Sequence, residues 1–218
     1  MEDLTEIVLD GDYDFAWDVL LNRRAFNPSD EDDWTPMHAA ALRDAHFLIR
    51  PLEIAGCSLT SFNKLGRTPI HIAASQNSTR FLREVMDPEL MCIRTDSEFE
   101  SMPIHSAVTY GHFEAVEMLL DAGVAPDVRD FYGLTLVHYA VVWKDQVGMI
   151  EMLASRGALI DEATTELGSP LQCAIEKRRY GAALSLIELG ADTNRTTSDG
   201  LSFAGLVHSA GWSGVIDY

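Results

Sequence analysis

Four histidines recur along the chain at almost constant intervals, and their side chains have the chemistry for metal binding or acid–base catalysis. They are His38, His71, His105 and His138, separated by 33, 34 and 33 residues. A zinc ion or a catalytic proton transfer needs several such groups to converge on one point. Because the spacing places one histidine in each structural repeat, we expect them to lie about a repeat apart. The sequence therefore predicts a structural role for them, with no metal site and no catalytic site.

Each histidine lies in a six-residue motif of which the chain carries six copies. The first copy is Thr35-Pro36-Met37-His38-Ala39-Ala40, and the last three copies keep the pattern less closely. The proline position of the motif falls at residues 36, 69, 103, 136, 170 and 203. A fixed period of this length indicates a repeat protein in which each unit packs only on its neighbours.

The period and the T-P-L-H-x-A pattern resemble those of the ankyrin repeat family, and the resemblance covers the whole chain. It implies an all-α fold: an ankyrin-repeat solenoid of stacked helix–turn–helix units with β-hairpin fingers. It also implies that the motif histidine hydrogen-bonds the backbone around the finger. Members of the family bind proteins through a concave face of finger tips and first helices. We therefore expect a binding protein that is not an enzyme and needs no cofactor.

The motifs place the remaining elements. We expect a single domain over residues 1–218, with an N-terminal capping unit at 1–33, five central repeats at 34–200 and a short C-terminal capping unit at 201–218. Expected second helices follow the motif helices, at 46–55, 79–86, 113–122, 148–156 and 180–189. The capping units are expected to hold helices at 4–10 and 13–22, and at 202–210 and 212–218.

Glycines are expected where the backbone must adopt positive φ. Second helices should end at Gly56, Gly123, Gly157 and Gly190, whereas Asp87-Pro88 replaces this glycine in one unit and predicts an irregular helix end. Finger turns should use Gly66, Gly133 and Gly200. Asp33, Glu100 and Leu167 stand at the equivalent positions, and Gly168 is expected to replace Leu167 after a shift of one residue.

The composition of the chain indicates which classes of partner it can bind. The net charge is −18, with 16 basic and 34 acidic residues, which disfavours nucleic acid and anionic membrane and favours a basic partner. The three cysteines are widely separated, as is typical of reduced thiols. No secretory signal or membrane-spanning run is recognisable. We expect an intracellular protein, cytoplasmic or nuclear, and a monomer.

The variable finger positions and the ends of the first helices are the candidate binding residues. They combine large apolar side chains with acidic ones, a combination suited to a Lys- or Arg-rich segment. The predicted protein-binding residues are Glu31, Asp32, Trp34, Leu65, Arg67, Glu98, Phe99, Tyr110, Phe131, Tyr132 and Trp143. The alternative for the aromatic residues is that they pack finger against finger or cover a defective turn. The alternative for the acidic surface is that it serves solubility only.

The leading hypothesis is an adaptor that binds a basic or amphipathic protein segment in the concave groove. Two alternatives remain open. One is an acidic chaperone that shields a very basic client protein through its whole surface. The other is the targeting or regulatory part of a larger enzyme or effector.

Overall fold

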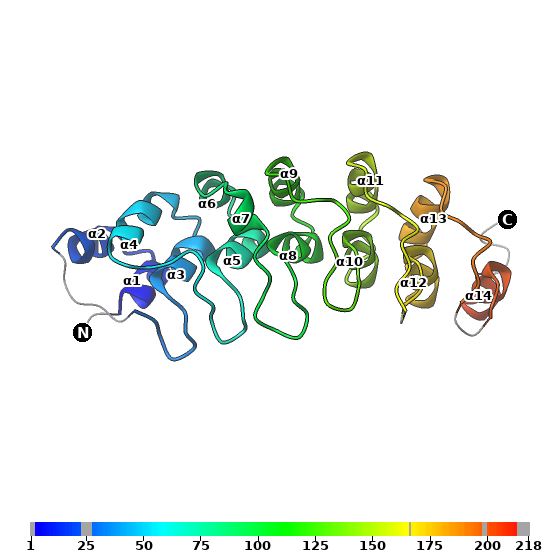
Figure 1. Cartoon of the computed structure of the whole chain (residues 1–218), viewed down its shortest axis with the longest axis horizontal. Helices are drawn as coiled ribbons and strands as arrows, with labels where there is room; N and C mark the ends of the chain where they lie inside the picture. Colours follow the sequence, from blue (N-terminus) through cyan, green and yellow to red (C-terminus); the bar gives the residue numbers. More distant parts are fainter. Residues whose placement is uncertain (1–2, 23–27, 166, 198–199, 213–218) are drawn as a thin grey trace. The chain divides into compact units, whose positions relative to one another are not determined.

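The computed structural model describes residues 3–22, 28–165, 167–197 and 200–212 (Figure 1). The chain forms two compact units, which we call unit 1 (Met1–Val124) and unit 2 (Ala125–Tyr218). Within the described residues the structure is helical, with only two isolated β-bridges, Arg129–Thr135 and Thr164–Gly168. No described helix is long and apolar enough to cross a membrane.

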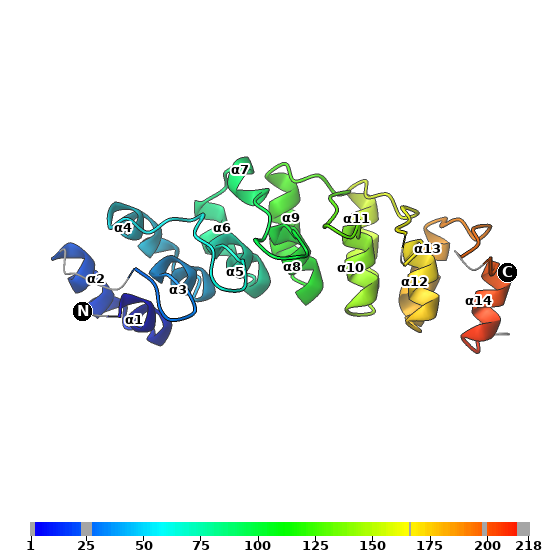
Figure 2. The ribbon, with the colours of Figure 1, turned by 60° about the horizontal axis from the view of Figure 1, so that its bottom comes forward.

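Unit 1 consists of helix pairs joined by long finger loops. The first helices α1, α3, α5 and α8 pack on one another in that order, and the second helices lie on one side of this row in Figure 2. The elements are α1 Leu4–Asp10, α2 Tyr13–Leu21, α3 Pro36–Leu42, the short 3₁₀ helix η1 His46–Leu48, α4 Ile49–Ile54, α5 Pro69–Gln76, α6 Thr79–Glu84, α7 Pro88–Met91, α8 Pro103–Tyr110 and α9 Phe113–Asp121.

Unit 2 continues the same plan. Its first helices α10, α12 and α14 pack in order, and α11 packs against α13. The elements are α10 Leu136–Val142, α11 Val147–Ser155, α12 Pro170–Glu176, α13 Tyr180–Glu188 and α14 Phe203–Ser209. The predicted helix pairs are therefore confirmed to within one or two residues at most ends. The expected helix at 212–218 falls almost wholly outside the described residues, and the division into one domain with two capping units stays a prediction.

The motif builds the first helices and buries them. A proline opens α3, α5, α8 and α12, where its missing N–H costs no hydrogen bond. Small residues follow it, so that neighbouring helices approach closely: Ala39, Ala40 and Ala41 of α3 are completely buried. The core of each unit is thus made by the repeated residues, which leaves the finger tips to vary.

Glycines with positive φ end the second helices as predicted. Gly56, Gly123, Gly157 and Gly190 have φ between 90° and 98°. The unit without this glycine departs from the pattern, also as predicted. There α6 ends at Glu84, and an additional short helix, α7, begins at Pro88.

The finger turns keep positive φ even where glycine is absent. Asp33 has φ 58° and Glu100 has φ 44°, although a side chain disfavours this region. In the turn where Leu167 replaces glycine, Gly168 has φ 69° and confirms the predicted shift. Residues other than glycine therefore adopt positive φ in two of these turns.

Candidate functional site

Three of the four motif histidines join a first helix to the finger that follows it, and in α8 the Nδ1 atom of His105 accepts a hydrogen bond from the backbone N–H of Met102 (3.0 Å). His38 accepts a hydrogen bond at Nδ1 from the backbone N–H of Thr35 (3.1 Å), and its Nε2 contacts the carbonyl oxygen of Arg67 (3.0 Å). His71 and His138 repeat this arrangement with the carbonyls of Ser101 (3.0 Å) and Gly168 (3.1 Å). Because Nδ1 accepts, Nε2 carries the proton and donates it to the carbonyl.

Burial keeps these imidazoles neutral. Desolvation lowers the pKa of His38 and His138, and it lowers the pKa of His71 to about 4. Each ring is fully buried and has both nitrogens occupied by backbone groups. Among the described residues, no cluster of three His, Cys, Asp or Glu side chains could hold a metal ion. The backbone hydrogen bonds of His38, His71 and His138 support the structural role that the spacing predicts for them.

In α12, Gln172 occupies the position of the motif histidine and keeps half of this arrangement. Its Oε1 accepts a hydrogen bond from the backbone N–H of Ser169 (2.8 Å), as Nδ1 does in the histidines. Glutamine therefore substitutes for histidine as a cap for the first helix.

In three fingers an Asp or Asn side chain stabilises the base of the turn, and this feature was not recognised in the sequence. Asp30 accepts hydrogen bonds from the backbone N–H groups of Asp32 and Trp34 (both 2.8 Å). Asn63 does the same for Leu65 and Arg67 (3.0 and 3.1 Å), and Asp130 for Leu134 (2.8 Å). Such short polar side chains are the usual stabilisers of tight turns. A signal was present, because Asp30, Asn63 and Asp130 each stand six residues before the proline position of their motif.

The third finger, residues 95–101, is longer than its neighbours. In the first two fingers the closing backbone hydrogen bonds join Asp30 to Trp34 and Asn63 to Arg67, four residues apart. In the third finger the closing bond joins Thr95 to Ser101, six residues apart (2.8 Å). Glu98 and Phe99 lie within this longer finger.

Backbone hydrogen bonds connect the three fingers of unit 1. The N–H of Lys64 donates to the carbonyl of Asp32 (3.0 Å), and the N–H of Asp96 donates to the carbonyl of Gly66 (2.8 Å). A Cβ atom at Gly66 would lie 2.1 Å from the carbonyl oxygen of Asp96, so this position requires glycine. The main chain thus holds the three finger tips at fixed spacing.

The predicted binding residues of unit 1 differ in exposure. Leu65 is 64% exposed and Phe99 is 43% exposed, and Glu31, Asp32 and Glu98 are also exposed. These five residues occupy neighbouring finger tips, and we call them the finger face of unit 1. Asp32 forms an ion pair with Lys64 (3.6 Å).

Three other predicted residues of unit 1 do not belong to the finger face, because two are half-buried and the third lies at the far end of a helix. Trp34 is half-buried, with its ring centroid 5.7 Å from that of His38. Arg67 is also half-buried, and its carbonyl receives the His38 bond. Tyr110 is exposed at the last residue of α8, whereas the finger precedes the first residue of that helix. The eight residues of α8 separate the two ends by about 12 Å, at 1.5 Å per residue.

In unit 2 the finger tip carries a pair of aromatic rings. Phe131 is 63% exposed and meets Tyr132 edge-on, with ring centroids 5.4 Å apart. Trp143 is also exposed, but it follows the last residue of α10 and lies at the helix end away from this finger. Phe131 and Tyr132 are therefore together, and Trp143 is not beside them.

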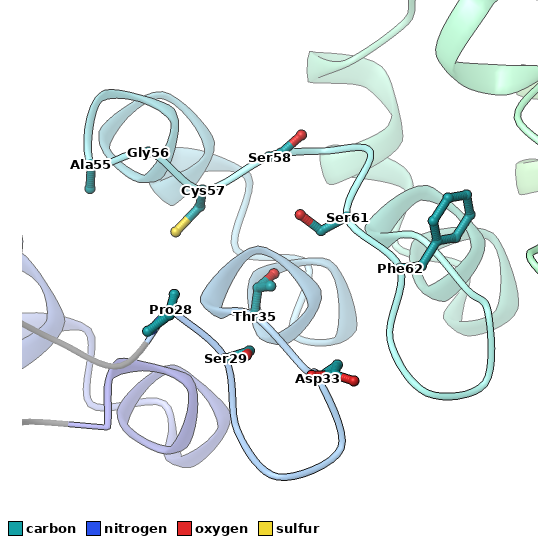
Figure 3. A pocket seen from close by; sticks show the side chains of 10 residues that line it. All are labelled: Pro28, Ser29, Asp33, Thr35, Ala55, Gly56, Cys57, Ser58, Ser61 and Phe62. Atoms are coloured by element: carbon teal, nitrogen blue, oxygen red, sulfur yellow. The ribbon is translucent and has the colours of Figure 1, made fainter.

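A cavity of about 530 Å³ lies in unit 1 between the first finger and the segment after α4 (Figure 3). Cys57 points into it in Figure 3, among the small polar side chains of Ser29, Thr35, Ser58 and Ser61. Burial raises the pKa of the Cys57 thiol to about 11. The thiol is therefore protonated at neutral pH and is a poor nucleophile.

Comparisons with known proteins agree with this geometry. The family model described as "Ankyrin repeats (many copies)" matches residues 92–140. The mouse B-cell lymphoma 3 protein homolog is 26% identical over 196 residues, which cover 86% of this chain and 43% of that protein. This chain spans less than half the length of the curated relatives it matches first.

Two solved structures share the fold. The ankyrin repeat domain of human ASB11 superposes with a TM-score of 0.78 at 23% identity, covering 94% of this chain and 91% of that one. The ankyrin repeat domain of Bcl-3 gives a TM-score of 0.78 at 21% identity, with 94% and 93% coverage. At these identities the likeness concerns the fold, which is typically non-catalytic and is used for protein–protein interaction.

Proposed function

Because this chain is an ankyrin-repeat protein, we propose that it is a non-enzymatic adaptor that binds a partner protein through the finger face of unit 1. The observation that carries this proposal is the composition of that face. Leu65 and Phe99 expose apolar surface on two neighbouring fingers, where the repeat core does not need them. Exposed large apolar residues on a rigid frame are typical of binding surfaces.

The charge of unit 1 supports a basic partner segment. The unit contains 22 acidic and 9 basic residues, a net charge of −13. Glu98 lies on the same finger tip as Phe99, and Glu31 lies on the first finger, next to the finger that carries Leu65. A segment with Lys or Arg beside an apolar side chain would complement both the acidic and the apolar residues of this face. The negative electrostatic field of unit 1 would also accelerate association of such a segment with the protein. The same charge disfavours nucleic acid and anionic membrane as ligands.

A second candidate function follows from the same charge. If the field of the whole acidic surface binds the client, the protein acts as an acidic chaperone for a very basic protein. In that case no single finger matters more than another, and affinity falls steeply with salt. We further propose a monomeric protein in the cytoplasm or nucleus; a targeting role within a larger protein remains compatible with the finger-face adaptor.

Affinity purification with the wild-type chain as bait, followed by mass spectrometry, identifies the partner, and a double substitution then tests the surface. Leu65→Ala with Phe99→Ala should weaken equilibrium binding at least tenfold, which corresponds to about 1.4 kcal/mol. Phe131→Ala with Tyr132→Ala is the matched control on a finger of unit 2 and should have a smaller effect. Circular dichroism verifies that both variants fold. Unchanged affinity for the Leu65/Phe99 variant would move the site away from the finger face.

A further inference from the structure

A second hollow surface of unit 1 lies among its second helices. A cavity of about 390 Å³ is bounded by η1 and α4 on one wall and by the end of α6 and the start of α7 on the other. In the view of Figure 1, α4, α6 and α7 lie on the side of unit 1 away from the finger loops. We call this cavity the outer groove.

The departure of one repeat from the common pattern creates this groove. Where other second helices end at a glycine with positive φ, α6 ends at Glu84 and the chain continues through Met86 to Asp87. Asp87 accepts a hydrogen bond from the backbone N–H of Glu89 (2.8 Å) and so begins the additional helix α7. This irregular segment, through Glu84, Val85, Met86 and Asp87, supplies one wall of the groove.

The floor of the groove exposes apolar side chains that are held in place. Phe47 is 42% exposed and Met86 is 43% exposed, and both line the cavity together with the buried Leu59 and Val85. The ring of Phe47 packs edge-on against Tyr13, with centroids 5.2 Å apart. Met86 is unbranched and polarizable, which allows it to fit side chains of different shape. The volume lies within the roughly 300–1,000 Å³ typical of ligand sites.

The rim of the groove is acidic. Glu53, Glu84 and Asp87 line it, and among its lining residues the only Lys or Arg is Arg50. Arg50 forms an ion pair with Glu53 (3.4 Å), so Glu84 and Asp87 give the rim a negative charge. An acidic or uncharged occupant would leave these carboxylates without complementary charge, whereas basic residues would complement them.

We infer that the outer groove docks a short amphipathic segment of a partner protein, with an apolar side chain between Phe47 and Met86 and basic residues beside Glu84 and Asp87. The argument rests on charge complementarity around a preformed apolar floor. This surface is additional to the finger face, so an adaptor with both could hold two segments at once.

The probe is a fluorescently labelled, helix-forming synthetic peptide of leucine and lysine. A second peptide with glutamate in place of each lysine is its matched control. Fluorescence anisotropy at about 0.15 M salt, where surface charges are partly screened, should show binding of the lysine peptide at least tenfold tighter than binding of the glutamate peptide. In protein labelled with ¹³C at the methionine methyl groups, the Met86 signal should shift on addition of the lysine peptide.

Two substitutions test whether the lysine peptide binds in the outer groove. Met86→Arg places a positive charge in the groove, which repels the positively charged lysine peptide and should weaken its binding at least tenfold. Leu189→Arg is the matched control, because Leu189 is similarly exposed (40%) at the end of α13 in unit 2, and it should change the affinity by less than twofold. Thermal melting verifies the fold of both variants.

Four results would overturn the inference. The first is no binding of the lysine peptide, and the second is equal binding of the two peptides. The third is a Met86 signal that stays fixed while Met86→Arg binds as wild type. If Leu65→Ala with Phe99→Ala abolishes peptide binding instead, the peptide occupies the finger face, which rejects the outer groove and leaves the proposed adaptor intact.

Discussion

The fingers of the two units are fastened in different ways, although the helix pairs behind them follow one plan. In unit 1, backbone hydrogen bonds join Lys64 to Asp32 and Asp96 to Gly66. Among the described residues of unit 2, side chains link successive finger segments at positions before the turns: Asp161 accepts from the backbone N–H of Asp192 (3.0 Å), and Arg129 pairs with Glu162.

This difference shows how a repeat protein can hold its fingers together with one set of groups and leave other side chains exposed for binding a partner. Where the main chain fixes the finger spacing, acidic side chains such as Glu31 and Glu98 are not needed for it and remain exposed. Where carboxylates fix the spacing, they are already engaged within the protein. Unit 1 also carries a net charge of −13, whereas unit 2, with 7 basic and 12 acidic residues, carries −5. Unit 1 is therefore the better candidate for binding a basic segment.

The largest expected effect tests whether the two units share equivalent cores. Leu119 in α9 and Leu153 in α11 are both buried, so Leu→Ala at either position should lower the free energy of unfolding by about 2–5 kcal/mol. Glu117→Ala, at an exposed site of α9, should change it by about 0.5 kcal/mol or less. Urea denaturation measures all three. A midpoint for Leu119→Ala close to that of Glu117→Ala would contradict the burial of α9.

The next prediction concerns the fastening of the fingers. Gly66→Ala should cost about 2–4 kcal/mol of unfolding free energy, because it combines positive φ with a clash against Asp96. Gly133→Ala in unit 2 also places a side chain at positive φ, but no atom lies within 4 Å of its Cβ. It should cost only about 1–2 kcal/mol. If urea denaturation gives equal losses of unfolding free energy for the two variants, the close contact between Gly66 and Asp96 adds nothing to the cost of the substitution.

A smaller effect concerns acid stability. The pKa of His71 is lowered from 6.5 to about 4 in the fold, so the unfolded chain binds a proton first. The resulting stability is complete above about pH 6.5 and is lost as the pH falls toward 4. Between about pH 7 and pH 5 we expect a loss of about 1–2 kcal/mol from this residue.

His71→Gln isolates this contribution. Gln172 shows that glutamine can cap a first helix in this protein, and glutamine does not titrate. Urea midpoints measured at both pH values should therefore fall less in the variant than in the wild type. The same midpoint shift in both proteins would mean that His71 does not titrate as its burial predicts.

The repeated parts of the fold could be predicted from the sequence because local chemistry determines them. The proline and histidine of each motif open a helix and cap it, and glycines such as Gly123 and Gly157 end one at positive φ. Regular spacing also ruled out a shared role for the histidines. None of these inferences needed knowledge of a distant contact.

The candidate site was less predictable because exposure depends on neighbours that are remote in sequence. Leu65 and Phe99 are as exposed as predicted, but Trp34 packs partly against His38. Tyr110 and Trp143 lie at the helix ends away from the fingers, which the repeat alignment did not reveal. The outer groove also escaped prediction, because the sequence indicated an irregular end of α6 but not what would surround it.

The most direct test of the finger face uses two charge reversals of equal size. Glu31→Lys with Glu98→Lys changes the finger face of unit 1, whereas Glu151→Lys with Glu188→Lys makes the same change of net charge at exposed sites of unit 2. Stopped-flow kinetics with the captured partner at two salt concentrations give the association rate constants. We expect the finger-face variant to associate at least threefold more slowly than the unit 2 variant at low salt, with a weaker salt dependence. Equal rate constants for the two variants would contradict a local site and favour the acidic chaperone.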